Sequence, residues 1–300
     1  MPVSHFLTLD DLTLDILHQL IDRAIDLKAQ TKRGAIYQPL KNKSLAMIFS
    51  KSSTRTRVSF EVGMRQLGGG TLNLSPADTQ IGRGEPLEDT ARVISSMVDG
   101  VMIRTDSHSD VETFAANSSV PVINGLTDDY HPCQLLADIQ TFQELRGSIK
   151  GATISWIGDG NNVCNSFMNA ARLFDFQLQI ATPKGFEPQE KFLSKNQSNA
   201  TLFEDPKDAV RGAHAVVTDT WASMGQENES AQRKRAFSEF CVNDELMALA
   251  KPDALFMHCL PAYRGQEVTS SVIEGAQSVV FQEAENRLHA QKALLEYLLG

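Results

Sequence analysis

The chain has 300 residues, of which 42% are hydrophobic and 22% charged, with a formal net charge of −9. This length exceeds what one hydrophobic core usually serves, so we expect two domains in a globular protein. The acidic balance excludes nucleic acid as the main partner, and an anionic ligand must be bound by a local cluster of cations. Residues 1–20 carry aspartates and no continuous apolar run, which predicts neither a signal peptide nor a membrane span.

The cysteines at 133, 164, 241 and 259 form neither a Cys-x-x-Cys pair nor a zinc-like spacing. We therefore expect no metal site. Free thiols are typical of a reducing compartment, and we expect a cytoplasmic protein.

The first half alternates amphipathic helices with short apolar strands. Residues 12–28 have the apolar spacing of a helix, and residues 31–43 form a polar connection. Strands are predicted at 44–49, 71–74, 101–105 and 120–124, and helices at 58–67, 87–98 and 133–145. The glycine-rich residues 75–86 are typical of a mobile loop.

The segment between the first predicted strand and the next helix has the composition of an anion site. The free N–H groups of the helix's first turn and its dipole point at one spot. The hydroxyls of Ser53, Thr54 and Thr56 lie there, and Arg55 and Arg57 add guanidinium groups suited to a phosphate. A plain helix cap with solvated arginines is the alternative.

Polar residues also stand where later elements begin or end. Arg104 closes a predicted strand, and the carboxyl ends of parallel strands are where α/β proteins place ligand-binding groups. A simple ion pair with Asp106 is the alternative for this arginine. His131 and Gln134 lie one turn apart where the 133–145 helix opens, with Pro132 well placed in its first turn.

The second half repeats the alternation of strands and helices. Strands are predicted at 152–157, 176–181, 215–218 and 254–257, a charged helical region at 186–196, a polar lid at 221–234 and a last helix at 283–299. The pattern predicts two parallel-sheet α/β domains linked by the 133–145 helix. The turn at 158–163 looks like a dinucleotide-binding turn. However, Val163 replaces the third glycine and no acidic residue lies about twenty positions on, so we reject a nicotinamide cofactor.

Three short motifs, in this order, resemble the signature of the aspartate/ornithine carbamoyltransferase family. They are Ser-Thr-Arg-Thr at 53–56, His-Pro-Cys-Gln at 131–134 and His-Cys-Leu-Pro at 258–261. Further matches at 78–85, 102–105, 219–225 and 283–289 extend the resemblance from about residue 40 to the C-terminus. Cys259 favours the ornithine branch, because the aspartate branch has proline there. Ser50 departs from the pattern, since many relatives carry glutamate at that position, which puts the fine tuning of the arginines in doubt.

The resemblance implies two parallel-sheet α/β domains joined by helices, with the C-terminal helix packing back on the first domain. Residues 1–132 with 284–300 would bind carbamoyl phosphate, and residues 133–283 would bind ornithine. The implied carbamoyl phosphate contacts are Ser53, Thr54, Arg55, Thr56, Gln80, Arg104, His131, Pro132, Cys133, Gln134 and Arg287. The implied ornithine contacts are Asn162, Asp219, Ser223, Met224, Cys259 and Leu260.

The resemblance also implies a mechanism and an assembly. Carbamoyl phosphate is an acyl phosphate that an amine can attack directly, so we expect neither a covalent intermediate nor a cofactor. Arg104 and His131 would polarise the carbonyl group, and Asp219 and Cys259 would deprotonate the amine, in a division that stays open. The expected assembly is a homotrimer in which Gln80 reaches a neighbour's site. Assembly beyond the trimer and the metabolic direction also stay open.

Two other functions are compatible with parts of this pattern. A carbamoyltransferase with another acceptor, such as putrescine or an acylated ornithine, is the first. The segment from Asp219 to Gly225 favours a free α-amino acid instead. A non-catalytic sensor of carbamoyl phosphate is the second, and the presence of site residues in both halves favours an enzyme.

Overall fold

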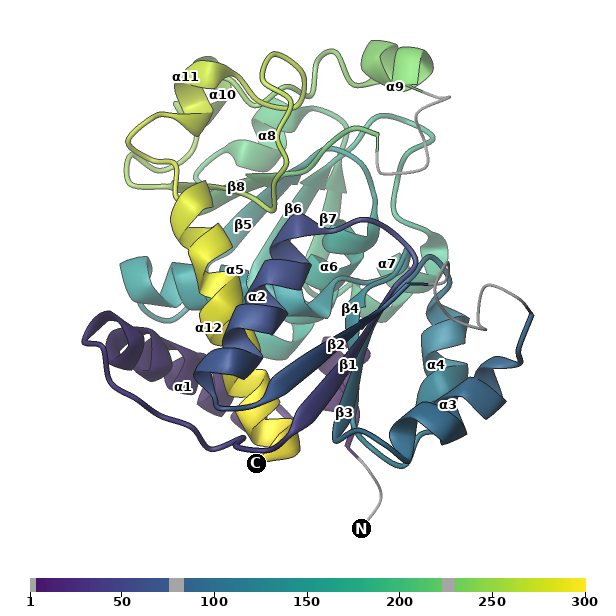
Figure 1. The fold of residues 1–300 in the computed structure, drawn as a ribbon. Coiled ribbons are helices and arrows are strands. Elements are labelled where there is room, and N and C mark those ends of the chain that lie inside the picture. Colours follow the sequence, from purple (N-terminus) through teal and green to yellow (C-terminus); the bar gives the residue numbers. More distant parts are fainter. Residues whose placement is uncertain (1–3, 76–83, 223–229) are drawn as a thin grey trace. The chain divides into compact units, whose positions relative to one another are not determined.

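The computed structural model describes residues 4–75, 84–222 and 230–300 (Figure 1). The chain divides into two compact units. One contains Met1–Gln140 and Glu285–Gly300, and the other contains Thr141–Ala284. Each unit has its own parallel sheet with helices around it, so the predicted fold class is confirmed.

The first unit contains a sheet of four parallel strands in the order β2-β1-β3-β4. The strands are β1 (Ser44–Phe49), β2 (Gly70–Leu74), β3 (Gly100–Arg104) and β4 (Val122–Leu126). The helices are α1 (Leu14–Lys32), α2 (Thr54–Gln66), α3 (Leu87–Ser95) and α4 (His108–Ala116), after a short 3-10 turn at Leu9–Asp11. Helix α5 (Pro132–Arg146) begins in this unit, and its later residues belong to the second.

The second unit contains five parallel strands in the order β7-β6-β5-β8-β9. The strands are β5 (Thr153–Ile157), β6 (Gln177–Ala181), β7 (Ala200–Phe203), β8 (Ala215–Thr218) and β9 (Leu255–His258). The helices are α6 (Asn162–Phe174), α7 (Glu190–Asn196), α8 (Pro206–Val210), α9 (Ser230–Ala236), α10 (Asp244–Met247) and α11 (Ser270–Ile273).

The central strands are buried on both faces, which explains their continuous apolar sequences. In the first unit Ala46, Ile48 and Ile103 pack in one core cluster with residues of α3 and α4. Because side chains alternate along a strand, the intervening Leu45 and Met47 are buried on the opposite face. Both faces of the sheet are thus covered, and the strand ends are where polar side chains become available.

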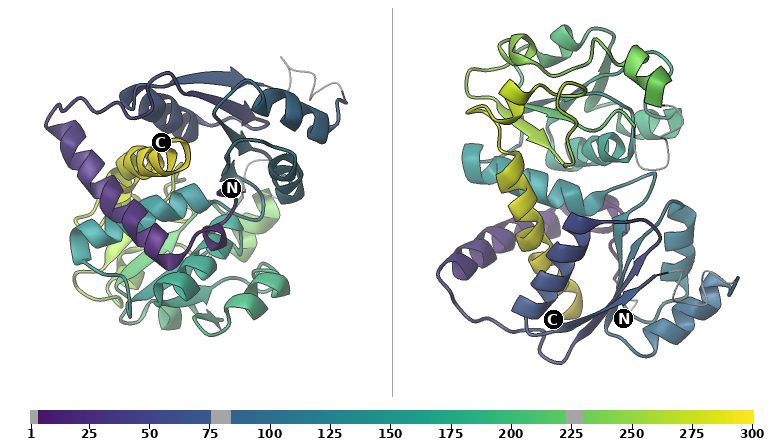
Figure 2. Two further views of the ribbon diagram at one scale, coloured as in Figure 1. Left: turned by 90° about the horizontal axis from the view of Figure 1, so that it is seen from below. Right: turned by 45° about the horizontal axis from the view of Figure 1, so that its top comes forward.

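The C-terminal helix α12 (Val280–Leu299) begins in the second unit, while its residues from Glu285 onward belong to the first. It lies beside α1 (Figure 2). There Lys28 bonds Asn286 and Lys292 bonds Thr31. A Cβ added to Gly100 would lie 2.8 Å from a side-chain carbon of Leu299, so α12 also approaches the start of β3 closely. The expected return of the last helix onto the first domain is therefore confirmed.

The fold differs from the sequence-based expectation at several elements. Helix α2 begins at Thr54 rather than at residue 58, because its first turn is polar and has no apolar periodicity. The half-exposed edge strand β7 and five helices were not predicted, namely α4, α6, α8, α10 and α11. Across the described part of the chain, every helix is too short or too polar to cross a membrane.

Candidate active site

The first candidate site lies where β1 gives way to α2. Ser53 occupies the N-cap position with an extended backbone, and within the described chain its hydroxyl makes no capping hydrogen bond to the helix. The N–H groups of the first turn are therefore left for a ligand, at the positive end of the helix dipole. The backbone N–H of Ser50 donates to the Arg104 carbonyl at 2.9 Å, which places the end of β3 beside this turn.

Two guanidinium groups converge on the same turn of α2. The hydroxyl oxygen of Thr56 lies 3.4 Å from Arg104 Nη1 and 3.4 Å from Arg287 Nη2. Arg104 comes from the carboxyl end of β3, and Arg287 comes from α12. All three side chains are buried, so the pair of cations concentrates positive charge in a region of low dielectric constant.

The start of α5 adds a buried imidazole and a buried amide. Burial lowers the pKa of His131 well below its usual value, and the cationic Arg287, Arg104 and Arg55 lower it further. The ring is therefore neutral at pH 7 and can donate one hydrogen bond. Gln134 accepts from Arg287 Nη1 at 2.6 Å and donates to Asp138 at 2.8 Å, so this amide holds Arg287 in place.

Some side chains near this site have other partners. Arg57, which was expected in the phosphate cluster, pairs with Glu61 at 3.2 Å on the exposed face of α2. The Cys133 thiol donates to the Asn124 carbonyl at 3.4 Å, and burial raises its pKa to about 12. This thiol is thus part of the interior of the fold.

Asp106, the alternative partner considered for Arg104, instead forms an ion pair with Lys51. Lys51 also lies 3.3 Å from Asp128. These contacts join the segments that follow β1, β3 and β4, next to the first turn of α2.

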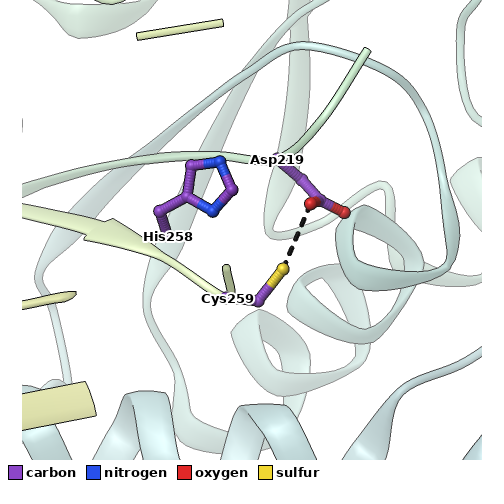
Figure 3. A group of neighbouring side chains, drawn as sticks. All are labelled: Asp219, His258 and Cys259. Carbon is purple, nitrogen blue, oxygen red and sulfur yellow. Dashed lines mark hydrogen bonds between the residues drawn. The ribbon is translucent and has the colours of Figure 1, made fainter. Parts of the chain in front are cut away.

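The second candidate site lies in the other unit and centres on Asp219, directly after β8 (Figure 3). One carboxylate oxygen accepts from the Thr220 N–H at 2.7 Å and from the Cys259 thiol at 3.1 Å. The other oxygen accepts from the Asn161 side chain at 2.8 Å. Asp219 as a residue is only 8% exposed, so donors hold its carboxylate in position while most solvent is excluded.

Asn161 is a site residue that sequence analysis missed in favour of Asn162. Its side-chain oxygen caps α6, accepting from the N–H groups of Val163 at 3.0 Å and Cys164 at 3.1 Å. Its amide nitrogen then faces Asp219. Asparagine directly before a helix is a typical N-cap, which is the signal that indicates this role. Asn162 is the first residue of α6 and is half-buried.

The backbone after Cys259 has an unusual conformation. Leu260 has a φ of 56°, which lies in the left-handed region that residues other than glycine seldom adopt. The Leu260–Pro261 peptide bond is cis. The Leu260 N–H donates to His258 Nδ1 at 2.9 Å, and His258 Nε2 lies 3.2 Å from the buried Glu267 carboxylate. His258 therefore supports the turn that presents Cys259, a role that sequence analysis did not assign.

Asp219, His258 and Cys259 place three potential metal-ligand atoms within 4.8 Å of one another. However, accepting the Leu260 N–H uses the lone pair of His258 Nδ1, so Nε2 carries the proton that faces Glu267. Among the described residues, this imidazole has no lone pair for a metal while those bonds persist. The cluster of Asp219, His258 and Cys259 is better suited to binding an amine, through the Asp219 carboxylate and the Cys259 thiol.

Three predicted site residues lie outside the described part of the chain. Gln80 belongs to the 76–83 segment, and Ser223 and Met224 belong to the 223–229 segment. The structure brings the remaining predicted residues into two groups. Arg104, His131, Gln134 and Arg287 lie around the α2 N-terminus in the first unit, and Asp219 with Cys259 lies in the second.

Comparisons with known proteins cover both units. Residues 4–144 match the family model described as aspartate/ornithine carbamoyltransferase, carbamoyl-P binding domain, and residues 150–298 match the Asp/Orn binding domain of the same description. An ornithine carbamoyltransferase from Nitrosococcus oceani is 64% identical over 299 residues, which covers 100% of this chain and 98% of that relative.

Solved structures agree with the sequence comparison. The ornithine carbamoyltransferase from Burkholderia thailandensis has a TM-score of 0.93 and 51% identity, covering 99% of each chain. That from Pyrococcus furiosus has a TM-score of 0.94 and 47% identity, covering 99% of this chain and 98% of the other. The similarity thus extends over essentially the whole length.

Proposed function

Since the chain belongs to the aspartate/ornithine carbamoyltransferase family, we propose that it transfers the carbamoyl group of carbamoyl phosphate to the side-chain amine of L-ornithine. The products are L-citrulline and phosphate. The observation that carries the choice of acceptor is the contact between Cys259 and Asp219. A buried carboxylate attracts a cationic amino acid and repels the second carboxylate of aspartate, which supports ornithine.

The first unit binds carbamoyl phosphate in this proposal. The phosphate accepts from the first-turn N–H groups of α2 and from the hydroxyls and guanidinium of Ser53, Thr54 and Arg55. Thr56, Arg104 and Arg287 complete the cluster, which concentrates cations locally although the chain has a formal net charge of −9. Pro132 and Cys133 border the site through their backbone, because the Cys133 thiol bonds inside the fold.

The carbonyl oxygen of the carbamoyl group is polarised by Arg104 and His131. A neutral His131 donates one hydrogen bond without adding a further positive charge beside the arginines, and its lowered pKa supports that state. Gln134 contacts the carbamoyl amide while its own oxygen holds Arg287. Donors fixed before the reaction stabilise the charge that develops on the oxygen, with little reorganisation.

The second unit binds ornithine and prepares its amine. Asn162, Ser223, Met224 and Leu260 contact the amino acid, and Asp219 and Cys259 lie at its reacting end. An alkyl amine is protonated near pH 7, so it gives up a proton to Asp219, directly or through Cys259. The amine nitrogen then forms a bond to the carbamoyl carbon as the bond from that carbon to the phosphate oxygen breaks. Phosphate leaves with the electron pair.

We further propose a cytoplasmic homotrimer in which Gln80 acts on the phosphate site of a neighbouring subunit. This proposal rests on the family resemblance, and models of that family match both units. The free cysteines support a reducing compartment.

The test is citrulline formation assayed in parallel with L-ornithine, putrescine, N-acetyl-L-ornithine and L-aspartate as acceptors. We expect turnover with L-ornithine to exceed the others by orders of magnitude. Turnover of putrescine equal to that of L-ornithine would show that the proposed acceptor is wrong. Absence of turnover with every acceptor, together with tight binding of carbamoyl phosphate, would favour a sensor.

A further inference from the structure

The first unit buries a lysine away from the phosphate cluster. Lys28 on α1 is 8% exposed, and its ammonium nitrogen lies 2.7 Å from Asn286 Oδ1 on α12. Lysine is almost never buried this deeply unless its charge is compensated, because removing an ammonium group from water is costly. A methionine would fill the same space without that cost, so the lysine calls for an explanation beyond packing.

The partner of Lys28 stands next to a residue of the candidate site. Asn286 immediately precedes Arg287, and its side-chain oxygen also accepts from Gln140 Nε2 at 3.2 Å. Arg287 in turn bonds Gln134 at 2.6 Å. At two adjacent residues, α12 is therefore held by side chains of α1 and α5.

Adjacent residues of a helix point about 100° apart around its axis, as follows from 3.6 residues per turn. Fixing the Asn286 side chain therefore fixes the rotation of α12 about its axis at Arg287. The guanidinium stands at the end of a long side chain, so a small rotation of the helix displaces it by a larger distance. A misplacement of about 1 Å can cost roughly 100-fold in a reaction that depends on positioning.

We propose that Lys28 is a positioning residue for carbamoyl phosphate, acting through Asn286 to hold Arg287 at the phosphate site. This inference rests on the proposed function of the first unit. In this proposal the ammonium group of Lys28 does not touch the substrate. It fixes α12, the helix that carries Arg287, and Arg287 contacts the substrate.

Lys292 offers a matched control for the charge and the burial. It is 4% exposed, lies on α12, and bonds Thr31 Oγ1 and Gln66 Oε1, each at 2.9 Å. Its side chain joins α12 to α1 and α2, as Lys28 joins α1 to α12. Neither of these two partners is adjacent to Arg287. A general effect of buried positive charge or of helix packing would act through both lysines alike.

The experiment compares Lys28→Met with Lys292→Met in the full-length protein, with carbamoyl phosphate titrated by calorimetry and both substrates varied in steady state. For Lys28→Met we expect carbamoyl phosphate affinity to fall roughly 10- to 100-fold, or about 1.4–2.8 kcal/mol, with KM for ornithine changed less than about threefold at saturating carbamoyl phosphate. Lys292→Met should lower thermal stability and leave carbamoyl phosphate affinity within about threefold. Equal losses of affinity in the two variants would overturn the proposal.

A double-mutant cycle separates positioning from a structural role. In an Arg287→Met background, Lys28→Met should weaken carbamoyl phosphate binding no further, because the group that it positions is absent. A full additional loss would show that Lys28 acts by another route. Asn286→Ala should reproduce the Lys28→Met effect, which keeps the test decisive if the lysine variant folds poorly. Wild-type protein that fails to bind carbamoyl phosphate would refute the proposed function, whereas normal binding by Lys28→Met refutes the positioning role alone.

Discussion

Replacing Asp219 by asparagine tests the ornithine site with almost no change of shape. The amide nitrogen must take the place of one carboxylate oxygen. Putting it at Oδ1 would break the bonds from Thr220 and Cys259, so it will take the Oδ2 position that faces Asn161. The Asn161 amide cannot turn to accept, because its oxygen caps α6 at 3.0 Å and 3.1 Å. Two donors will then face each other.

The expected cost has a structural and a binding component. A buried donor without an acceptor destabilises the fold by about 1–3 kcal/mol. Removing the charged partner of a buried pair costs binding about 2–5 kcal/mol, so ornithine affinity should fall roughly 30- to 5,000-fold. Carbamoyl phosphate is proposed to bind residues of the other unit, so its affinity should change less than about threefold.

The assay is calorimetric titration of carbamoyl phosphate, combined with steady-state kinetics in which ornithine is varied. Asp208→Asn serves as the control. The Asp208 carboxylate is exposed, and its ion pair with Arg211 is a long surface contact of 3.9 Å. That variant should behave as wild type in both measurements. Carbamoyl phosphate binding weakened more than ornithine binding by Asp219→Asn would show that the allocation of substrates to the two units is wrong.

Three further predictions concern the phosphate site, pH and assembly. Arg55→Ala should weaken carbamoyl phosphate binding by about 2–5 kcal/mol, measured by the same titration; unchanged affinity would remove Arg55 from the site. Activity should rise with pH up to about 8, because the amine must lose a proton, and the lowered pKa of His131 means that this ring adds no inflection of its own near 6.5. A pH profile of kcat/KM with such an inflection, lost in His131→Asn, would contradict the neutral imidazole. Arg55→Ala and Gln80→Ala subunits, each inactive alone, should regain roughly a quarter of wild-type sites when mixed equally and reassembled into trimers, because a cyclic trimer repeats one directional contact. Mixed trimers verified by native mass spectrometry that stay inactive would place Gln80 outside the neighbour's site.

Local sequence singled out candidates where chemistry and chain position coincide. Arg104 ends an apolar strand, and His131 with Gln134 opens a helix after a turn, while their roles were implied by the family resemblance. The partners of buried polar groups were not predictable in this way. His258 is paired with Glu267 across an irregular segment, and Asn161 contacts Asp219 from a different strand–helix turn. Apolar periodicity carries no information about such contacts, because they depend on the three-dimensional arrangement of strand ends.

The same reason applies to the partner of Arg57. The sequence neighbours of Arg57 suit a phosphate, yet this arginine lies one turn from Glu61 on the exposed face of α2, where an ion pair forms within the helix. Sequence analysis weighted the composition of the segment and not the direction of each side chain. Residues two apart in a helix point about 200° apart around its axis, so Arg55 and Arg57 leave α2 in different directions.

The path of α12 has a consequence for biosynthesis. The first unit needs Glu285–Gly300, whose Leu294 and Leu295 are fully buried and whose Arg287 reaches Thr56. A nascent chain ending near Gln140 has all four strands of that sheet but an uncovered apolar surface and an incomplete cation cluster. Domains that are continuous in sequence can fold in the order of synthesis. Here the unit that leaves the ribosome first is completed only when the last helix has been made.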